Sequence, residues 1–484
     1  MADKKYNIIL ITTDQQRYDT IGDLAPDYMR MPHTQYLINQ GISYTNAYSQ
    51  CPLCVPARIS IMNGKFPHTT GATTNCETTD VMGTRNTLPD LMRQAGYQTI
   101  AIGKMHFGPQ RAKHGFDEMI IPDDYFREMQ RSGSMLQPMR HGMGQNEIYP
   151  ALSTVPEAMT MTSWISEKCV EYIRDRRDPS QPFFMWCSYS KPHPPFDPPE
   201  PYYSMYRNED IAEPVFGDWS DDEHAPLAFK RLRQMWGYDK ISPKIMKEAK
   251  AAYYGLLTQI DYNMGRIFSA LQDFDMLKDT LILFTSDHGE YLGDHHTAAK
   301  FFLHQPSTHV PFILRLPPTL NDTLGGTKVD IPVTHADILP TLVKLAGGEV
   351  PKDVDGQDLL AVLEKKQEPR KYVEMVSEMG MLESIGLTDG KMKYIWYMED
   401  QCEQLFDLEK DPLELKNIVH DPAYAAIKEE LKQDLINSEH SKKLGHSKDG
   451  KLATIPPLND GERHRRAHPW PGYHTEYCNI DVKH

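Results

Sequence analysis

The chain has few cysteines and few basic residues for its size. Among 484 residues there are 7 cysteines, and 52 lysines and arginines stand against 67 aspartates and glutamates, so the net charge is −15. An odd number of scattered cysteines argues against a disulfide framework and favours reduced thiols. The negative charge argues against nucleic acid or an anionic membrane as the main partner, because both require a basic surface.

Long apolar segments are also missing. No run of about 18 apolar residues occurs, so no transmembrane helix is expected. The chain enters the apolar stretch 8–11 without the apolar region and cleavage site of a secretory signal. We therefore expect a cytoplasmic protein for the chain as given, or a periplasmic one if a signal peptide has been removed. A hydrophobic content of 40% excludes a disordered chain.

Strand-like and helix-like segments alternate through the first 350 residues. The short apolar runs typical of buried strands are 7–13, 97–102, 183–189, 280–285 and 310–315. The segments with helical start and stop signals are 34–41, 87–96, 244–275 and 336–346. This alternation predicts an α/β fold, in which residues 1–350 form a large domain with a central, mostly parallel sheet flanked by helices.

The pattern changes after about residue 350. Residues 371–377 and 384–397 read as antiparallel strands, with Asp389-Gly390 as a hairpin turn, and a helix is expected near 423–438. Residues 351–484 are therefore predicted to form a smaller α+β C-terminal subdomain with an antiparallel sheet, followed by an irregular tail.

Two predicted strands are followed directly by polar side chains. Asp14 and Gln15 follow the strand at 7–13, and Asp287 and His288 follow the strand at 280–285. Functional residues of open α/β sheets lie just beyond the carboxyl ends of strands, so these four could share one divalent cation. Oxygen ligands favour Ca²⁺ or Mg²⁺, and an imidazole extends the choice to Mn²⁺ or Zn²⁺. Taken singly, each aspartate is better explained as a cap of the next helix or turn.

Cys51 and Cys54 permit two interpretations. As a Cys-x-x-Cys pair they would form a redox pair or half of a zinc site, which would make the protein a non-catalytic zinc or redox module. No second Cys-x-x-Cys occurs. Read from Cys54, the segment is Cys-x-Pro-x-Arg, ending at Arg58 and followed by Asn63-Gly64. This pattern resembles the signature of type I sulfatases, in the alkaline phosphatase superfamily.

The resemblance implies a nucleophile and a metal site. In that family the signature cysteine is oxidised to formylglycine by the formylglycine-generating enzyme, so Cys54 is the expected nucleophile and Arg58 its neighbour. Asp14 and Gln15, together with Asp287-His288, stand where the family binds its metal, for which we expect one Ca²⁺ ion, or Mn²⁺ as the second choice. Gln15 and His288 depart from the more common Asp-Asp and Asp-Asn pairs.

The same resemblance assigns the residues around the sulfate group. Lys104 and His106 lie in a segment similar to the family's Gly-Lys-x-His, and they inherit roles at the sulfate and the formylglycine. His193, in Lys-Pro-His-Pro, matches the histidine that faces the leaving-group oxygen. Lys300 stands where the family keeps a sulfate-binding lysine.

The sequence thus predicts hydrolysis of a sulfate monoester. We expect a sulfated disaccharide or oligosaccharide as substrate, such as a glycosaminoglycan uronate carrying a 2-O-sulfate. Cationic side chains for its carboxylate could come from His304, His309, Arg465 and Arg466. A choline sulfatase and a phosphonate monoester or phosphodiester hydrolase of the same superfamily are the alternatives.

Overall fold

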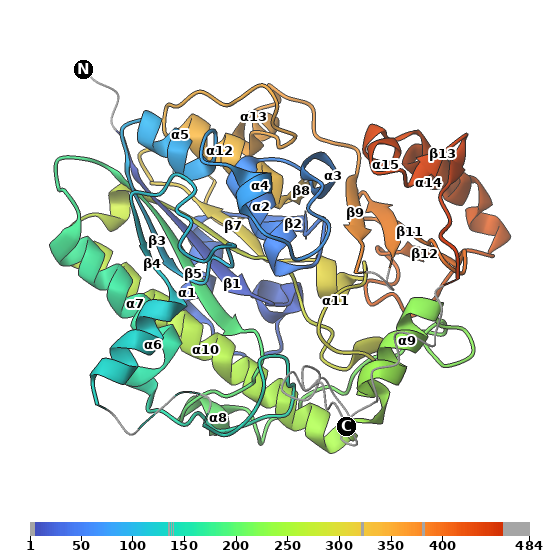
Figure 1. Ribbon diagram of the computed structural model, residues 1–484, viewed down its shortest axis with the longest axis horizontal. Helices are drawn as coiled ribbons and strands as arrows, with labels where there is room; N and C mark the ends of the chain where they lie inside the picture. The colour runs from blue at the N-terminus through green and yellow to red at the C-terminus, as the bar shows by residue number, and fades with distance from the viewer. Residues whose placement is uncertain are drawn as a thin grey trace, which may run out of the picture.

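The computed structural model describes residues 5–457 except 134, 135, 137, 139, 321–323 and 380–382. Its largest feature is an eight-stranded sheet with the strand order β4-β3-β5-β1-β6-β7-β2-β8 (Figure 1). The strands are β1 (Asn7–Asp14), β2 (Ile42–Tyr48), β3 (Gln98–Gly103), β4 (Glu118–Ile120), β5 (Phe183–Pro192), β6 (Thr280–Ser286), β7 (Phe312–Arg315) and β8 (Thr327–Thr334). All pairings are parallel except those of β7, which runs antiparallel to both β6 and β2.

Helices cover both faces of this sheet because its central strands are apolar on both sides. In β1, Ile8 and Leu10 point to one face, and Ile9 and Ile11 point to the other. The first face packs against α2 (Cys54–Asn63), α5 (Leu88–Gln94) and α12 (Ile338–Leu345). The opposite face packs against α1 (Pro32–Gln40), α7 (Met161–Glu171) and the long α10 (Pro243–Asp273).

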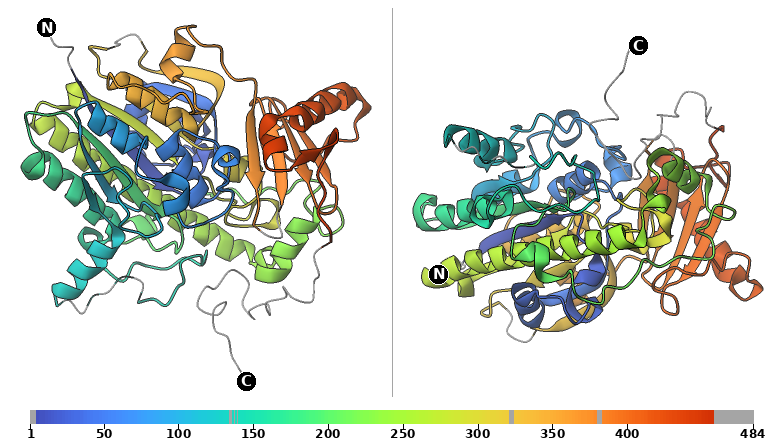
Figure 2. Two further views of the ribbon diagram at one scale, coloured as in Figure 1. Left: turned by 45° about the horizontal axis from the view of Figure 1, so that its top comes forward. Right: turned by 90° about the horizontal axis from the view of Figure 1, so that it is seen from below.

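A second, antiparallel sheet lies beside the first, as the orange strands in Figure 2 show. Its order is β12-β11-β10-β9, and it consists of β9 (Val373–Ser377), β10 (Ser384–Thr388), β11 (Met392–Tyr397) and β12 (Glu403–Asp407). The helices α14 (Ala425–Asn437) and α15 (Glu439–Lys443) follow it, together with the short strands β13 (Ser447–Lys448) and β14 (Lys451–Leu452). The Asp389-Gly390 turn joins β10 to β11, and Gly390 has a φ of 88°, which glycine adopts without steric cost.

Shorter helices surround these two layers. They are α3 (Pro67–Thr70), α4 (Thr79–Met82), α6 (Pro122–Arg131), α8 (Tyr202–Met205), α9 (Leu227–Trp236), α11 (Gln305–Thr308) and α13 (Leu359–Leu363). In the described ranges, no helix is both long and apolar enough to cross a membrane.

The predicted fold class is confirmed, and the differences lie at the edge of the main sheet. The strand at β8 has no counterpart in the sequence prediction, because this outermost strand is only half buried and lacks a continuous apolar run. The last strand of the main sheet, β8, ends at Thr334, and the first strand of the antiparallel sheet, β9, begins at Val373. The predicted boundary at 350 lies between these two strands. The predicted irregular tail falls largely outside the described residues.

Candidate active site

Asp14 and Asp287 meet at one edge of the main sheet. Strands β1 and β6 are parallel neighbours, with Thr13 opposite Ser286, so the residues that follow them come together. The backbone N–H of Gln15 donates to Asp287 Oδ1 at 3.1 Å. Both aspartates are fully buried. The rule that parallel strands present functional residues at their carboxyl ends therefore holds here.

Cys54 is the first residue of α2 and points at these carboxylates. Its Sγ lies 3.8 Å from Asp14 Oδ1 and 3.2 Å from His288 Nε2. Burial and Asp14 would raise the pKa of the thiol, but the positive charges of Lys300, Lys104 and His288 hold this pKa well below its usual value. The site therefore stabilises an anion at position 54, beside the positive end of a helix.

Arg58 follows one turn later on the same helix and binds both aspartates. Its Nη2 lies 2.9 Å from Asp287 Oδ2 and 3.4 Å from Asp14 Oδ2, and its Nη1 donates to Ser188 Oγ at 2.8 Å. Ser188 lies in β5 and was not predicted from the sequence. A single serine carries no recognisable signal, since its role depends on β5 lying next to β1.

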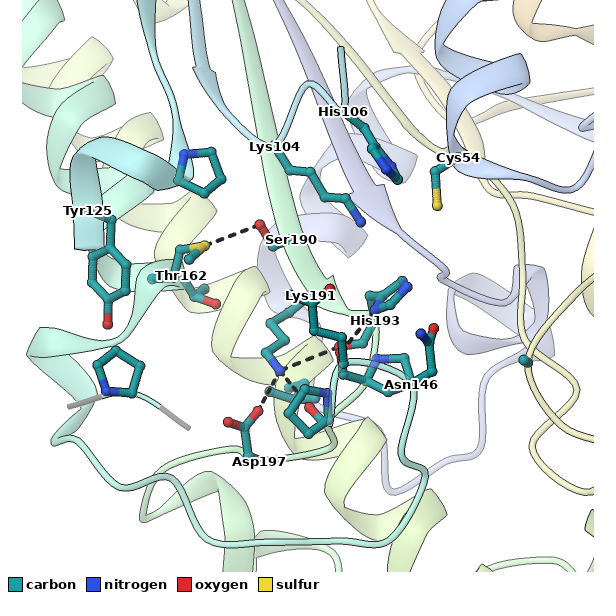
Figure 3. A pocket seen from close by; sticks show the side chains of 18 of the residues that line it. Cys54, Lys104, His106, Tyr125, Asn146, Thr162, Ser190, Lys191, His193 and Asp197 are labelled. Carbon is teal, nitrogen blue, oxygen red and sulfur yellow. Dashed lines mark hydrogen bonds and ion pairs between the residues drawn. The ribbon is translucent and has the colours of Figure 1, made fainter. Parts of the chain in front are cut away.

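Lys104 and His106 follow β3 on the neighbouring side of the site. The Nζ of Lys104 pairs with Asp14 Oδ2 at 2.5 Å. The preceding Gly103 has a φ of 100°, and a Cβ there would lie 2.0 Å from the carbonyl oxygen of Ser188, so only glycine fits. His106 is exposed and lines the pocket, on the same wall as Cys54 and Lys104 (Figure 3).

Lys300 and His193 form a contacting pair. Lys300 Nζ lies 3.1 Å from His193 Nε2 and donates to Gln15 Oε1 at 2.6 Å. His193 Nδ1 lies 2.9 Å from the carbonyl oxygen of Pro194, so Nδ1 carries the hydrogen and Nε2 accepts from Lys300. Burial, followed by the charges of Lys300 and Lys104, holds the pKa of His193 well below its usual value. His193 is therefore neutral near pH 7.

The donor set suits a divalent cation. Ligand atoms of Asp14, Cys54, Asp287 and His288 all lie within 4.8 Å of one another, and no other group of this kind occurs among the described residues. His288 Nδ1 lies 3.0 Å from the carbonyl oxygen of Gly289, which turns Nε2 toward Cys54 Sγ and the two carboxylates, where a metal would bind. Two carboxylates, the Gln15 amide oxygen and one imidazole are ligands that calcium and manganese accept.

The site opens into a cavity of about 610 Å³ (Figure 3). Cys54, Lys104, His106, His193 and Lys300 all contribute to its lining. Lys191 binds Asp197 and donates to the carbonyl oxygen of Pro195 at 2.5 Å, and so braces the loop that carries His193. The remaining lining is rich in amide and aromatic side chains, among them Gln110, Tyr125, Gln145, Asn146, Trp236 and Gln259.

The structure corrects the placement of two expected substrate-binding residues. His304 is fully buried, contacts Tyr291 Oη and Gln404 Oε1, and stacks on Trp219 with ring centroids 4.4 Å apart. His309 bonds to the carbonyl oxygen of Thr45 and stacks on Tyr18 and Tyr48. Neither lines the cavity. Burial lowers the pKa of His309 to about 3, so it supplies no charge for a carboxylate. Arg465 and Arg466 lie outside the described residues.

Comparison with known proteins shows to which family the chain belongs. The family model named Sulfatase matches residues 6–348, and the model for the C-terminal part of N-sulphoglucosamine sulphohydrolase matches residues 293–441. The chain belongs to the sulfatase family. It is a hydrolase of the alkaline phosphatase superfamily, whose sulfatases typically use a metal ion and a formylglycine.

Two curated sulfatases are similar over most of their length. An arylsulfatase of Clostridium perfringens is 32% identical, covering 94% of this chain and 98% of the relative. A choline-sulfatase of Rhizobium meliloti is 29% identical, covering 87% of this chain and 84% of the relative.

Solved structures share the fold of this sulfatase. The phosphonate monoester hydrolase of Agrobacterium radiobacter superposes with a TM-score of 0.77 at 22% identity, covering 94% of this chain and all of the other. A protein solved with its substrate D-glucosamine-2-N,6-O-disulfate gives a TM-score of 0.73 at 23% identity, covering 92% and 99% of the two chains.

The alternative of a non-catalytic zinc or redox module is wrong. The chain is a sulfatase-family enzyme, and Cys51 does not join Cys54 at the site. Cys51 is buried, and its Sγ donates to the carbonyl oxygen of Thr73 at 3.3 Å. The two cysteines share a sequence motif but have different contacts, because Cys51 precedes α2 and Cys54 begins it.

Proposed function

We propose that this sulfatase hydrolyses a sulfate monoester to an alcohol and sulfate, using Cys54 after its oxidation to formylglycine. The observation that carries the proposal is the position of Cys54, which faces Asp14 and His288 at the start of α2 and lines the large cavity. A formylglycine at this position would add water to form a hydrate, and one hydroxyl group of this hydrate would attack sulfur. The formylglycine-generating enzyme is the expected maturation partner.

The metal would lie between Asp14, Gln15, Asp287 and His288. We propose Ca²⁺, with Mn²⁺ as the second choice, since three of the four ligands are oxygen donors. When bound, such an ion stabilises negative charge on sulfate oxygens and on the attacking oxygen.

Cationic side chains would complete the sulfate-binding site. Arg58 is held against Asp14 and Asp287 and braces position 54. Lys104 and Lys300 line the cavity and present ammonium groups to the sulfate, whose charge moves toward the bridging oxygen as the S–O bond breaks.

The histidines are suited to moving protons. His193 is neutral and its Nε2 lies 3.1 Å from Lys300 Nζ, so this pair is placed to deliver a proton to the departing alcohol. His106 lies on the wall with Cys54 and is proposed to accept a proton from position 54.

We propose a sulfated carbohydrate as the substrate. The cavity is large enough for a disaccharide, and its amide side chains match sugar hydroxyl groups as donors and acceptors. A glycosaminoglycan uronate carrying a 2-O-sulfate is our specific candidate, and its carboxylate would depend on Arg465 and Arg466, since His304 and His309 do not reach the cavity.

A panel of substrates tests this proposal. Formylglycine-containing enzyme, verified by intact mass, is assayed on sulfated disaccharides, 4-nitrophenyl sulfate, choline sulfate and phenyl phosphonates. The Cys54→Ala variant serves as the matched control. Preference for a disaccharide sulfate supports the proposal. Preference for choline sulfate would overturn the sugar assignment, and preference for a phosphonate ester would replace the reaction by that of a phosphonate monoester hydrolase.

A further inference from the structure

The side-chain amide of Gln15 is held between an acid and a base. Its Nε2 donates to Glu290 Oε2, and its Oε1 accepts from Lys300 Nζ at 2.6 Å. Gln15 and Glu290 are both fully buried. An ammonium group can only donate and a carboxylate can only accept, so a single orientation of the amide satisfies both neighbours.

Glu290 also organises the loop that carries Lys300. Its Oε1 accepts from the backbone N–H of Leu292 at 3.0 Å and from that of Ala299. These two bonds tie together the ends of the loop that immediately precedes Lys300. Each contact donates a hydrogen to Glu290, so both of its oxygens act as acceptors. One side chain therefore aligns both the Gln15 amide and its lysine partner.

The backbone of Gln15 is fixed in an uncommon conformation. Its φ is 74°, in the left-handed region that costs a residue with a Cβ about 1 kcal/mol or more. Its N–H donates to Asp287 and its carbonyl oxygen accepts from Tyr253 Oη at 2.7 Å. Such strain persists only where the surroundings hold the residue in place, and it clusters at functional sites.

We infer that Glu290 is a positioning residue that presents the oxygen of Gln15, rather than its NH₂ group, to Lys300 and to a metal ion. This inference rests on the proposed function of Gln15 as a metal ligand. An aspartate at position 15 would need no such partner, because both of its oxygens accept. An amide has a single oxygen, so a glutamine ligand requires a group that orients it.

An exchange of the two side chains tests the inference. In Glu290→Gln, the new carbonyl oxygen keeps the two backbone N–H donors, so an NH₂ group faces the NH₂ group of Gln15. In Gln15→Glu, two carboxylates face each other. The double variant Gln15→Glu/Glu290→Gln restores one donor for each acceptor at unchanged net charge. Ca²⁺ binding is measured by calorimetry, and kcat is measured on the ester that the wild type hydrolyses.

We expect each single variant to lose at least about tenfold in Ca²⁺ affinity and kcat, the range typical of residues that orient a metal ligand. The double variant should bind Ca²⁺ more tightly than either single variant. Wild-type Ca²⁺ affinity in Glu290→Gln would overturn the inference. So would a loss of Ca²⁺ affinity in the double variant that equals the product of the two single-variant losses.

Controls separate this role from folding and from the proposed reaction. Glu414→Gln alters an equally buried glutamate outside the cavity and should leave Ca²⁺ affinity unchanged. Glu290→Asp, which keeps the carboxylate, should fold and retain more affinity than Glu290→Gln; equal losses would overturn the inference. If the wild type hydrolyses no sulfate ester while the calcium data still show rescue, the proposed function fails and the positioning role stands.

Discussion

Two buried groups of charges in this protein have opposite protonation behaviour. In the candidate active site, Asp14 contacts Arg58 and Lys104. At the boundary with the C-terminal sheet, Lys393 of β11 pairs with Glu414 at 2.8 Å, and both side chains are fully buried. Gln305 of α11 contacts both partners of this second pair.

The number of partners accounts for the difference. Burial raises the pKa of Asp14, but the positive charges of Lys104, Arg58 and His288 bring this pKa well below its usual value. In the isolated pair, burial outweighs the single partner, so the pKa of Glu414 is raised and that of Lys393 is lowered. Several cations keep a buried acid ionised, as the proposed metal ligand Asp14 has to be, whereas the single cation Lys393 only joins two layers of structure.

The largest expected effect is on catalysis. Asp287→Asn keeps the shape of the side chain but removes a negative charge that both Arg58 and a metal require. We expect kcat to fall about 100- to 1000-fold, by analogy with the loss of a group that stabilises transition-state charge. Steady-state kinetics measures this, with circular dichroism to confirm folding. Full activity in Asp287→Asn would show that catalysis does not require the negative charge of this buried aspartate.

The next effect is on stability. Glu414→Gln leaves the buried ammonium of Lys393 without a counter-charge, and we expect a loss of about 3 kcal/mol in the free energy of unfolding, measured by urea denaturation. The kcat value should be unchanged. The double variant Lys393→Met/Glu414→Leu should recover most of the loss, since an apolar pair removes the unpaired charge. A drop in kcat without a loss of stability would contradict the structural role.

Calcium should distinguish the two groups directly. Ca²⁺ at about 100 times its dissociation constant should raise the free energy of unfolding of the wild type by about 2.7 kcal/mol. The same stabilisation should appear in Glu414→Gln and disappear in Asp287→Asn. Thermal unfolding with and without chelator measures it. If Ca²⁺ stabilised Glu414→Gln and Asp287→Asn equally, the ion would bind at a site that does not include Asp287.

The smallest effect concerns a buried histidine that contacts no counter-charge among the described residues. His68 of α3 lies among His440 and His446, with ring centroids 5.4 Å and 6.3 Å away. Burial and these neighbours, with Lys443, hold its pKa well below 6.5. Below pH 6.5 the unfolded chain binds a proton that the folded chain does not, so stability falls as the pH falls.

The variant His68→Gln should reduce this pH dependence. We expect the loss of stability between pH 7.5 and pH 5.5 to be smaller than in the wild type by about 1.4 kcal/mol, the contribution of one group titrated one unit below its pKa. Urea denaturation at the two pH values measures the difference. An identical pH dependence in both proteins would show that folding does not change the pKa of His68.

Local patterns in the sequence predict much of this protein. Residues 7–13 and 280–285 are short apolar runs that became the adjacent strands β1 and β6, because strands apolar on both faces are stable only inside a sheet covered by helices. The spacing of Cys54 and Arg58 also has a local cause, since residues four apart lie on one side of a helix. Such features depend on a few neighbouring residues, so the sequence by itself determines them.

Only the tertiary structure decided which other side chains reach the site. Ser188 and Glu290 contact Arg58 and Gln15 across 130 and 275 residues of chain, and no local pattern marks them. His304 lies four residues from Lys300, yet its ring is buried against Trp219 while Lys300 lines the cavity. The physical reason is that burial and hydrogen bonding are set by packing between distant segments, which determines whether a polar side chain faces a pocket or the core.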